Sequence, residues 1–519
     1  MIRSFKTDIE RVVRENSQQR ALLDSKTGRV WTYTALFEAM IGFGALLTST
    51  GVRPGDRIFS VLPNGVEQLV AFLAALWCGV DFCPISPLAT LDESCKCILA
   101  SRCVAGLVPY NLNPHIREKL GECTLKKSAI SVPLDGDLTR YATRVAAQVD
   151  AANAQSGRLL IFTSGTTANP KAVVHDGDRL WSSAMAWSEF HSWLDRDARF
   201  YNILPMSYLG GLFNLGLIPF ACGGSVVISD PFSGTLALKF WRQIKQNDVN
   251  TLWLAPSMIR ALVRLYKPSA EIDAARSQVR ASFLGMAPIG PSEKERFEDL
   301  FGIQLLENFA LSETTFLTSK KLGDSPRRHP GSVGKPLPWA EVRLSPLADD
   351  PSRSEIEAKT PFLFNGYMDS QGEISRPLTP DGFFRTGDLG VFGEGEVLIL
   401  KGRWKDVVKK GGYLITLRDI EEVAEGHELV KEAAAIGVPH EFYGETPVLC
   451  VELSGGGRLP KEILGELRTL LTKGLAKFKW PGEIVAMESL PRTESGKVQK
   501  WVLKDWVESR RAVIDSVSF

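Results

Sequence analysis

The sequence lacks the features that mark several protein classes. Its eight cysteines form no CxxC pair, and it has neither a basic tail nor an acidic run. The formal net charge is +1, so no overall field favours nucleic acid or an anionic membrane as a partner. The N-terminal segment MIRSFKTDIERVV has no apolar stretch typical of a signal peptide. Scattered free thiols favour a reducing, cytoplasmic environment, and we expect no internal repeat or low-complexity segment.

Three closely spaced cysteines, Cys95, Cys97 and Cys103, invite comparison with a metal site. Their spacing fits no zinc pattern, and the segment is typical of a helix that leads into an apolar strand. We therefore expect these side chains to be buried as small hydrophobic groups.

Residues 209–228 are almost wholly apolar and long enough to span a bilayer. They contain Asn214, Pro219 and five glycines, which are unusual in such a span. A buried helix, a glycine turn and a buried strand explain the segment better, so we predict no transmembrane segment.

The amino-acid composition is that of an ordinary globular protein, with 44% hydrophobic and 23% charged residues. At about 150 residues per domain, the length predicts roughly two to four domains. Strand-like runs such as RIFSVL alternate with helix-length segments such as GVEQLVAFLAALWCG, which predicts an α/β fold with mostly parallel strands. Glycine-rich short strands over residues 340–400 predict a small β-rich subdomain.

The order of helix-like and strand-like segments changes near Lys405. We therefore predict a large multi-sheet N-terminal α/β domain over residues 1–404, and a small C-terminal α/β domain over residues 405–519.

One short stretch, TSGTTANPK over Thr163–Lys171, concentrates hydroxyl groups, glycine and a cation. Backbone N–H groups and hydroxyls in a tight loop form anion sites, and a lysine adds a point charge suited to phosphate. The preceding RLLIF is typical of a strand, so the loop would lie at a strand end, where α/β sheets bind ligands. It is not a GxxxxGK[ST] P-loop, and on residue types alone a Ser/Thr-rich surface turn remains an alternative.

Further motifs follow in a fixed order: LGMAP (284–288), NFALSET (308–314), GFFRTGDLG (382–390), GRWKDVVKKGGYLITLRDIE (402–421) and PRTESGKVQK (491–500). Together with TSGTTANPK they resemble the signature segments of the acyl-adenylate-forming (AMP-binding) superfamily, which includes acyl-CoA synthetases, adenylation domains and luciferases. The resemblance covers nearly the whole chain. It implies a carboxylic acid activated by ATP to an acyl-adenylate, then transferred to a thiol of CoA or of a carrier-protein phosphopantetheine, with a small mobile lid domain.

The resemblance also assigns roles to individual residues. The nucleotide would be held by a phosphate loop, an adenine-flanking set and a ribose-side pair: Thr163, Ser164, Gly165, Thr166, Thr167 and Lys171; Gly285, Ala287, Pro288, Asn308 and Phe309; Asp388 and Arg403. Glu313 matches the Mg²⁺ ligand, and Ser312 keeps a hydroxyl near the α-phosphate. Lys497 would bridge the substrate carboxylate and the α-phosphate, as a charge contact made mainly in the transition state.

Other positions would serve the acyl group and the thiol. Lys405 matches the hinge, and Gly411 and Gly412 would line the path of a pantetheine arm. The acyl pocket would include four residues: Tyr208, Leu209, Gly210 and Ala310. Amino-acid-activating relatives carry an aspartate where Leu209 stands, and a neutral site disfavours burying an ammonium group. We therefore expect a small carboxylic acid without an α-amine, and any carrier protein would act in trans.

The sequence departs from the family pattern at several positions. Alanine replaces the usual glycine at Ala168, Ala172 and Ala310, and Leu417 replaces a proline. Alanine tolerates positive φ poorly, so each alanine must adopt negative φ or carry strain. Three alternatives stay open: an acyl-AMP ligase that serves only an amine or a carrier, a non-catalytic nucleotide-binding regulatory module, and a slow pseudoenzyme.

Overall fold

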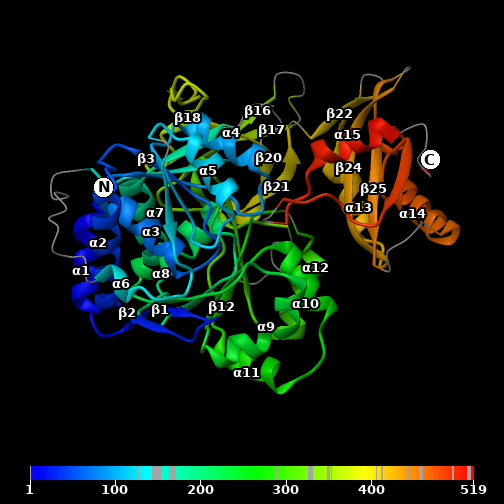
Figure 1. The fold of residues 1–519 in the computed structure, drawn as a ribbon. Coiled ribbons are helices and arrows are strands. Elements are labelled where there is room, and N and C mark those ends of the chain that lie inside the picture. The colour runs from blue at the N-terminus through cyan, green and yellow to red at the C-terminus, as the bar shows by residue number, and fades with distance from the viewer. Residues whose placement is uncertain are drawn as a thin grey trace. The chain divides into compact units, whose positions relative to one another are not determined.

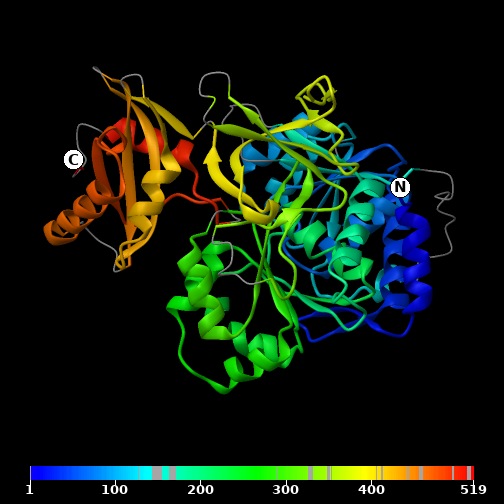
Figure 2. The ribbon, with the colours of Figure 1, turned by 180° about the vertical axis from the view of Figure 1, so that it is seen from behind.

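The computed structural model describes these residues: 2–126, 128–142, 155–162, 171–287, 289–324, 331–347, 351, 353–404, 406–410, 413–440, 443–454, 460–493, 496–510 and 516–518. They pack into two compact units (Figures 1 and 2). Unit 1 comprises Met1–Pro330, Gly334–Glu341 and Lys359–Gly382. Unit 2 comprises Gly331–Val333, Val342–Ala358 and Phe383–Phe519. The predicted domain boundary at Lys405 falls inside unit 2, and the position of a hinge there stays a prediction.

Unit 1 contains two large mixed sheets. Strands of the first are, in spatial order, β15 (Lys335–Pro336), β14 (Thr315–Ser319), β13 (Leu305–Leu311), β12 (Ala281–Leu284), β11 (Thr251–Leu254), β9 (Arg199–Asn202), β10 (Ser225–Ile228), β1 (Arg20–Asp24) and β2 (Val30–Thr32). Strands of the second are β19 (Ile374–Ser375), β18 (Gly366–Met368), β8 (Ala172–Asp176), β7 (Arg158–Phe162), β4 (Asp81–Pro84), β3 (Arg57–Ser60), β5 (Ala105–Pro109) and β6 (Ser128–Val132).

Strand pairing in both sheets is parallel through the centre, as the sequence predicts. Strands β1, β10, β9, β11, β12 and β13 pair in parallel, and so do β7, β4, β3, β5 and β6. Antiparallel pairs occur at β13–β14, β7–β8 and β8–β18. The β13–β14 pair is joined by a tight connection, which carries the candidate site residues Ser312 and Glu313.

Helices of unit 1 cover the sheets and follow the predicted strand–helix alternation. They are α1 (Phe5–Glu15), α2 (Tyr33–Ser49), α3 (Val66–Cys78), α4 (Leu91–Ser101), α5 (Pro114–Glu122), α6 (Thr139–Ala142), α7 (Gly177–Phe190), a π-helix η1 (Gly210–Asn214), α8 (Ile218–Ala221), α9 (Gly234–Gln246), α10 (Pro256–Arg264), α11 (Ala270–Gln278) and α12 (Pro291–Phe301). Helix α4 begins with a capping box between Thr90 and Glu93. Helix α3 ends at Gly79 in the left-handed region, as glycine favours.

Helix α7 connects the two sheets of unit 1. It starts where β8 ends, with Asp176 accepting hydrogen bonds from two backbone N–H groups as its N-cap. Its Trp187 packs against Trp253 of β11 and Phe316 of β14, in the other sheet. Buried aromatic contacts of this kind contribute large apolar areas to the core. The position of α7 is thus fixed relative to both sheets.

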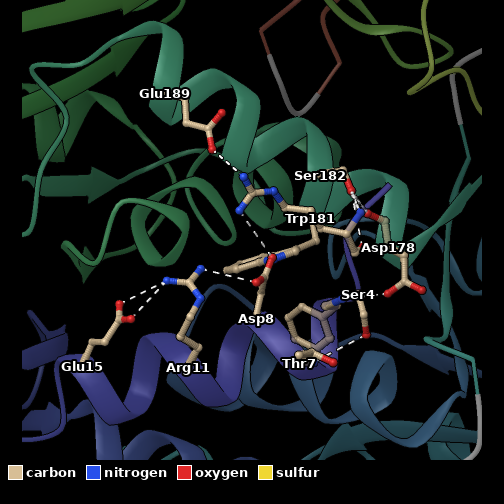
Figure 3. Close-up of polar contacts among 11 residues, drawn as sticks. Ser4, Thr7, Asp8, Arg11, Glu15, Asp178, Trp181, Ser182 and Glu189 are labelled. Carbon is tan, nitrogen blue, oxygen red and sulfur yellow. Dashed lines mark hydrogen bonds and ion pairs between the residues drawn. The ribbon is translucent and has the colours of Figure 1, made fainter. Parts of the chain in front are cut away.

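Helix α1 holds α7 from the outside through polar contacts (Figure 3). Asp8 accepts a hydrogen bond from Nε1 of Trp181 over 3.1 Å. Asp178 accepts one from the backbone N–H of Phe5 over 2.8 Å. The backbone N–H of Arg3 donates to Oγ of Ser182 over 2.7 Å. These contacts hold the first two turns of α7, directly after strand β8.

Unit 2 contains a small sheet and a larger one. The small sheet is formed by β16 (Glu341–Pro346), β17 (Ser354–Lys359), β20 (Phe384–Phe392) and β21 (Leu398–Arg403), with a 3₁₀ turn η2 (Glu394–Glu396). The larger contains β22 (Val407–Lys410), β23 (Tyr413–Thr416), β24 (Val430–His440), β25 (Gly444–Leu453), β26 (Glu483–Met487) and β27 (Ser516–Ser518). Helices α13 (Leu417–Glu425) and α14 (Lys461–Gly474) cover one face, and a 3₁₀ turn η3 (Lys477–Lys479) follows α14. Helix α15 (Lys500–Arg510) covers the opposite face (Figure 1).

The structure confirms the predicted fold class and several local predictions. A small sheet forms where the sequence predicts a β-rich subdomain, and its strands belong to unit 2 rather than to the large unit 1. The apolar segment 209–228 forms η1, the short helix α8, a turn at Gly223 and the buried strand β10. Within the described residues, none of the helices combines the length and apolar character that spanning a bilayer demands. Cys103 is buried, and Cys95 and Cys97 pack partly buried against the same core cluster.

Candidate functional site

The connection between β13 and β14 is a tight turn that presents Ser312 and Glu313. Leu311 and Thr315 face each other across the strand pair, and the turn residues lie between them. Thr315 has a φ of 56°, which is rare for a β-branched residue. Backbone strain of this kind persists only where the surroundings enforce it, and it concentrates at functional sites. Ser183 of α7 supplies one such constraint by donating to Oγ1 of Thr315 over 2.9 Å.

Glu313 is held by two contacts from a neighbouring segment. The hydroxyl of Tyr367, on β18, donates to its Oε1 over 2.7 Å. The backbone N–H of Phe364 donates to its carbonyl oxygen over 2.8 Å. Both the carboxylate and the main chain of Glu313 are therefore fixed from the second sheet.

Ser312 is held through its main chain by a buried histidine. Nε2 of His175, on β8, donates to the carbonyl oxygen of Ser312. Its Nδ1 makes no hydrogen bond to any residue that the structure describes. Burial lowers the pKa of His175 to about 4, outweighing the hydrogen bond to Ser312. The ring is therefore neutral near pH 7, with its proton on Nε2.

Gly285 and Asn308, both predicted to flank adenine, lie side by side, Gly285 directly after β12 and Asn308 in the middle of β13. Asn308 donates from Nδ2 to the carbonyl oxygen of Leu284 over 3.0 Å. A Cβ at position 285 would lie 2.9 Å from Oδ1 of Asn308, closer than real contacts allow. This close approach, rather than a positive φ, is what favours glycine here.

Phe309 and Ala310 lie at an irregularity of strand pairing. The register between β13 and β14 shifts between them, as in a β-bulge, a feature frequent beside active sites. Phe309 retains 6% of its surface, whereas Ala310 is exposed. Neither Ala310 nor Ala172 has a positive φ. Both alanines therefore replace glycine without the backbone strain of a positive φ, which is the first of the two alternatives predicted from the sequence.

The segment after β12 lies beside the π-helix η1, near the residues predicted to form the acyl pocket. Tyr208 and Leu209 are half-buried at the start of η1. A Cβ on Gly210 would lie 3.0 Å from Cδ1 of Leu204 and 3.7 Å from Sδ of Met286. Met286 is 40% exposed and has a φ of 76°. Sequence reasoning missed Met286, because no residue type signals a strained, exposed methionine.

The predicted phosphate loop is only partly described. Residues Thr163, Ser164, Gly165, Thr166 and Thr167, as well as Ala168 and Pro288, lie outside the described residues. The flanking strands β7 and β8 are antiparallel, and Phe162 pairs with Ala172. The strand pairing therefore brings the two ends of the loop side by side, and Lys171, directly before β8, is exposed.

In unit 2, Asp388 and Arg403 form an ion pair between β20 and β21. The strand register sets them opposite one another, and Nε of Arg403 donates to Oδ1 of Asp388 over 2.8 Å. Asp388 is 8% exposed and Gly387, before it, has a φ of 72°. Burial raises the pKa of Asp388, and the charge of Arg403 opposes that rise.

Lys497 lies near this pair, in a turn that precedes α15. Its backbone N–H donates to Oγ1 of Thr493 over 3.1 Å, and its carbonyl oxygen accepts from the Thr493 N–H over 2.8 Å. Lys497 is exposed to solvent. Partial desolvation and the charge of Arg403 lower the pKa of Lys497, and Asp388 acts in the opposite direction. The structure thus groups the three predicted residues Asp388, Arg403 and Lys497 within unit 2.

The predicted hinge and thiol path fall largely on undescribed positions. Lys405, Gly411 and Gly412 lie outside the described residues. The next residue, Asp406, contacts two helices. Nζ of Lys500, on α15, lies 3.2 Å from its Oδ2. The backbone N–H of Leu417, on α13, donates to its carbonyl oxygen over 3.0 Å. Leu417 is the first residue of α13, a position that proline also favours.

The chain matches the models of a known enzyme family. The family model of AMP-binding enzymes matches residues 9–368, and the model of the AMP-binding enzyme C-terminal domain matches residues 419–497. The chain belongs to the AMP-binding enzyme family. The resemblance inferred from the motifs is confirmed.

Individual AMP-binding enzymes match over nearly their whole length. The oxalate–CoA ligase of Arabidopsis thaliana is 27% identical over 511 residues, covering 95% of this chain and 97% of that protein. The sulfoacetate–CoA ligase of Cupriavidus necator is 30% identical over 486 residues, covering 92% and 93%. The crystal structure of ATP-bound MatB from Rhodopseudomonas palustris superposes with a TM-score of 0.83 at 25% identity, covering 96% and 98%.

These matches confirm the predicted enzyme class. This AMP-binding enzyme is an acid–thiol ligase of the AMP-forming type, which activates a carboxylic acid with ATP. The roles of the individual residues named above stay predictions.

Proposed function

We propose that this chain activates a small carboxylic acid without an α-amine and transfers the acyl group to CoA. The observation that carries the acceptor is its similarity to CoA ligases over more than nine-tenths of their length. Leu209, half-buried at the start of η1, supports the absence of an α-amine, because an apolar side chain there leaves a buried ammonium without a partner.

The similar ligases act on oxalate and sulfoacetate, which are short acids with a second acidic group. We extend this substrate class to the present chain. Leu204 and Met286 lie close to Gly210, which favours a short acyl chain at this position. The phenol of Tyr208 supplies a polar group at the same segment.

The nucleotide roles follow the resemblance. Residues of the β7–β8 loop and Lys171 would offset the charge of the leaving pyrophosphate, and Gly285 and Asn308 would flank adenine. Asp388 would accept hydrogen bonds from the ribose hydroxyls, in an orientation that Arg403 maintains.

Glu313 fits the Mg²⁺ site that the family implies. Tyr367 donates to its Oε1, and Oε2 has no hydrogen bond or ion pair to any residue that the structure describes, which leaves one hard oxygen for a metal. Mg²⁺ commonly takes one or two protein carboxylates and completes its shell with phosphate and water oxygens. Bound there, Mg²⁺ would neutralise charge on the phosphates.

Lys497 would act in the first half-reaction. The substrate carboxylate is a poor nucleophile toward a polyanion, so a cation beside both reacting groups lowers the barrier. Its proximity to Asp388 and Arg403 within unit 2 supports this role. The thioester half-reaction would need Lys497 to leave, by rotation about Lys405, with Gly411 and Gly412 beside the thiol.

The free cysteines fit a cytoplasmic location. All eight cysteines are free, as expected for a reducing compartment.

The test is pyrophosphate release from ATP with a panel of acids: oxalate, malonate, sulfoacetate, propionate, benzoate and alanine. We expect release with one or more short acids and none with alanine. Mass analysis after adding CoA, and separately a phosphopantetheinylated carrier protein or an amine, then identifies the acceptor. Transfer only to the carrier or the amine would contradict the CoA assignment, and no release with any acid would favour a regulatory module.

A further inference from the structure

The Ser312–Glu313 turn is restrained by three elements that lie far from it in sequence. His175 on β8 binds the carbonyl oxygen of Ser312, 137 residues away. Tyr367 on β18 binds the carboxylate of Glu313, 54 residues away. Ser183 on α7 binds the strained Thr315 at the end of the turn, 132 residues away.

These restraints act on different atoms, so together they fix the orientation of the turn. His175 fixes one peptide unit, and Tyr367 fixes one carboxylate oxygen. The Phe364 N–H fixes the next carbonyl oxygen, over 2.8 Å. A carboxylate with one oxygen hydrogen-bonded to a protein donor has fewer accessible rotamers, and the other oxygen then points in a defined direction.

The elements that carry the restraints are themselves rigid. β8 pairs with β7 and β18 on its two sides, and Gly366 faces Val174 across the latter pair. His175 is completely buried. It directly precedes Asp176, which caps α7. The side chains of His175 and Tyr367 are therefore held by a sheet rather than by a loop.

We propose that His175 and Tyr367 are positioning residues that hold the Ser312 hydroxyl and the free Glu313 oxygen in the geometry that Mg²⁺-bound ATP requires. The proposal rests on the proposed metal-binding role of Glu313. Neither residue needs to touch the nucleotide. Partners that orient a metal-binding carboxylate in this way affect metal affinity or activity by about 10- to 100-fold when removed.

The first test uses Tyr367→Phe, which removes one hydroxyl and keeps the ring packed on Phe364. We expect the Mg²⁺ concentration for half-maximal pyrophosphate release to rise about 10-fold or more. The rise in thermal midpoint on adding MgATP should shrink, whereas the KM for the carboxylic acid should change little. Tyr110→Phe, at a tyrosine that is 68% exposed, is the matched control.

The second test separates positioning from a merely structural role of His175. His175→Leu removes the donor, and His191→Leu makes the same change at another buried histidine of unit 1. Both variants should lose stability, but only His175→Leu should raise the Mg²⁺ requirement. His175→Gln keeps an N–H donor near the Nε2 position and should restore much of the wild-type Mg²⁺ response.

Two outcomes would overturn the proposal. One is an unchanged Mg²⁺ requirement and an unchanged MgATP thermal shift in Tyr367→Phe. The other is an equal Mg²⁺ response of His175→Leu and His191→Leu. A wild-type protein that binds MgATP but releases no pyrophosphate would contradict the proposed function alone, because the thermal shift still tests the positioning. A wild-type protein without any MgATP thermal shift would contradict both.

Discussion

Arg403 and Asp388 face each other across the β20–β21 pair, joined by a 2.8 Å hydrogen bond from Nε to Oδ1. Asp388 is 8% exposed, and the charges of Arg403 and Lys497 both oppose the rise in its pKa that burial causes. This arrangement leaves Oδ2 of Asp388 as an oriented acceptor.

Asp388→Asn should therefore weaken ATP binding. An amide loses the charge that strengthens hydrogen bonds to the ribose, and such bonds contribute about 1.5–3 kcal/mol. We expect the KM for ATP to rise about 10- to 100-fold in pyrophosphate release assays. Glu357→Gln is the control, because Glu357 is a buried carboxylate that pairs with Arg343 and Arg385 in the same small sheet. Equal ATP responses of the two variants would argue against the ribose assignment.

Lys497→Ala should separate the two half-reactions. Loss of a cation at the reacting groups should slow acyl-adenylate formation about 100- to 1,000-fold. Thioester formation from supplied acyl-adenylate and CoA should stay close to wild type, because Lys497 is assigned no role there. Lys504→Ala, at a partly exposed lysine of α15, is the control. Equal losses in both half-reactions would contradict the assigned role.

Lys294→Met should destabilise unit 1 strongly. Lys294 and Glu307 form an ion pair with 4% and 6% of their surfaces exposed. Removing one partner leaves a buried charge and costs about 3–5 kcal/mol, whereas replacing both by apolar groups is often neutral. We expect a large fall in thermal midpoint for Lys294→Met and recovery in Lys294→Met/Glu307→Leu. Arg276→Met breaks an exposed pair with Asp273 and should change stability by less than about 1 kcal/mol.

His191→Phe should flatten the acid dependence of stability. Burial lowers the pKa of His191 to about 3 from 6.5, so the unfolded chain binds the proton more tightly than the native protein. The stability contributed by the neutral ring is complete above about pH 6.5 and is lost progressively as the pH falls toward 3. Between pH 7 and pH 5 the wild type should lose about 2 kcal/mol more than His191→Phe. Urea unfolding at both pH values measures this difference, with His115→Phe at an exposed histidine as control; parallel losses in all three proteins would contradict it.

Local elements could be predicted from sequence, whereas the contacts around the turn could not. Periodicity predicts the strand in RIFSVL and the helix that follows, and the structure has β3 and α3 there. The contact between His175 and Ser312 has no local signal, because it depends on which strands of two sheets become neighbours. The same holds for Tyr367 and Glu313. Motif resemblance identified Ser312 and Glu313, but the residues that hold them required the fold.

Two further features show where residue types mislead. The π-helix η1 appears in the sequence only as a glycine-rich apolar run. Strand β8 is antiparallel to β7, although the central strands of both sheets are parallel. An apolar run such as AVVHD predicts a buried strand but carries no information on its direction.

The hydrogen bond from Leu417 to Asp406 has a consequence for protein engineering. A designer who follows family consensus would restore proline at the first residue of α13, expecting a stiffer unfolded chain and a gain of about 0.4–1 kcal/mol. Proline has no N–H, so the Asp406 carbonyl would lose its donor in the same exchange. The consensus substitution would thus loosen the chain beside residue 405 while rigidifying residue 417, and its net benefit would be smaller than sequence statistics suggest.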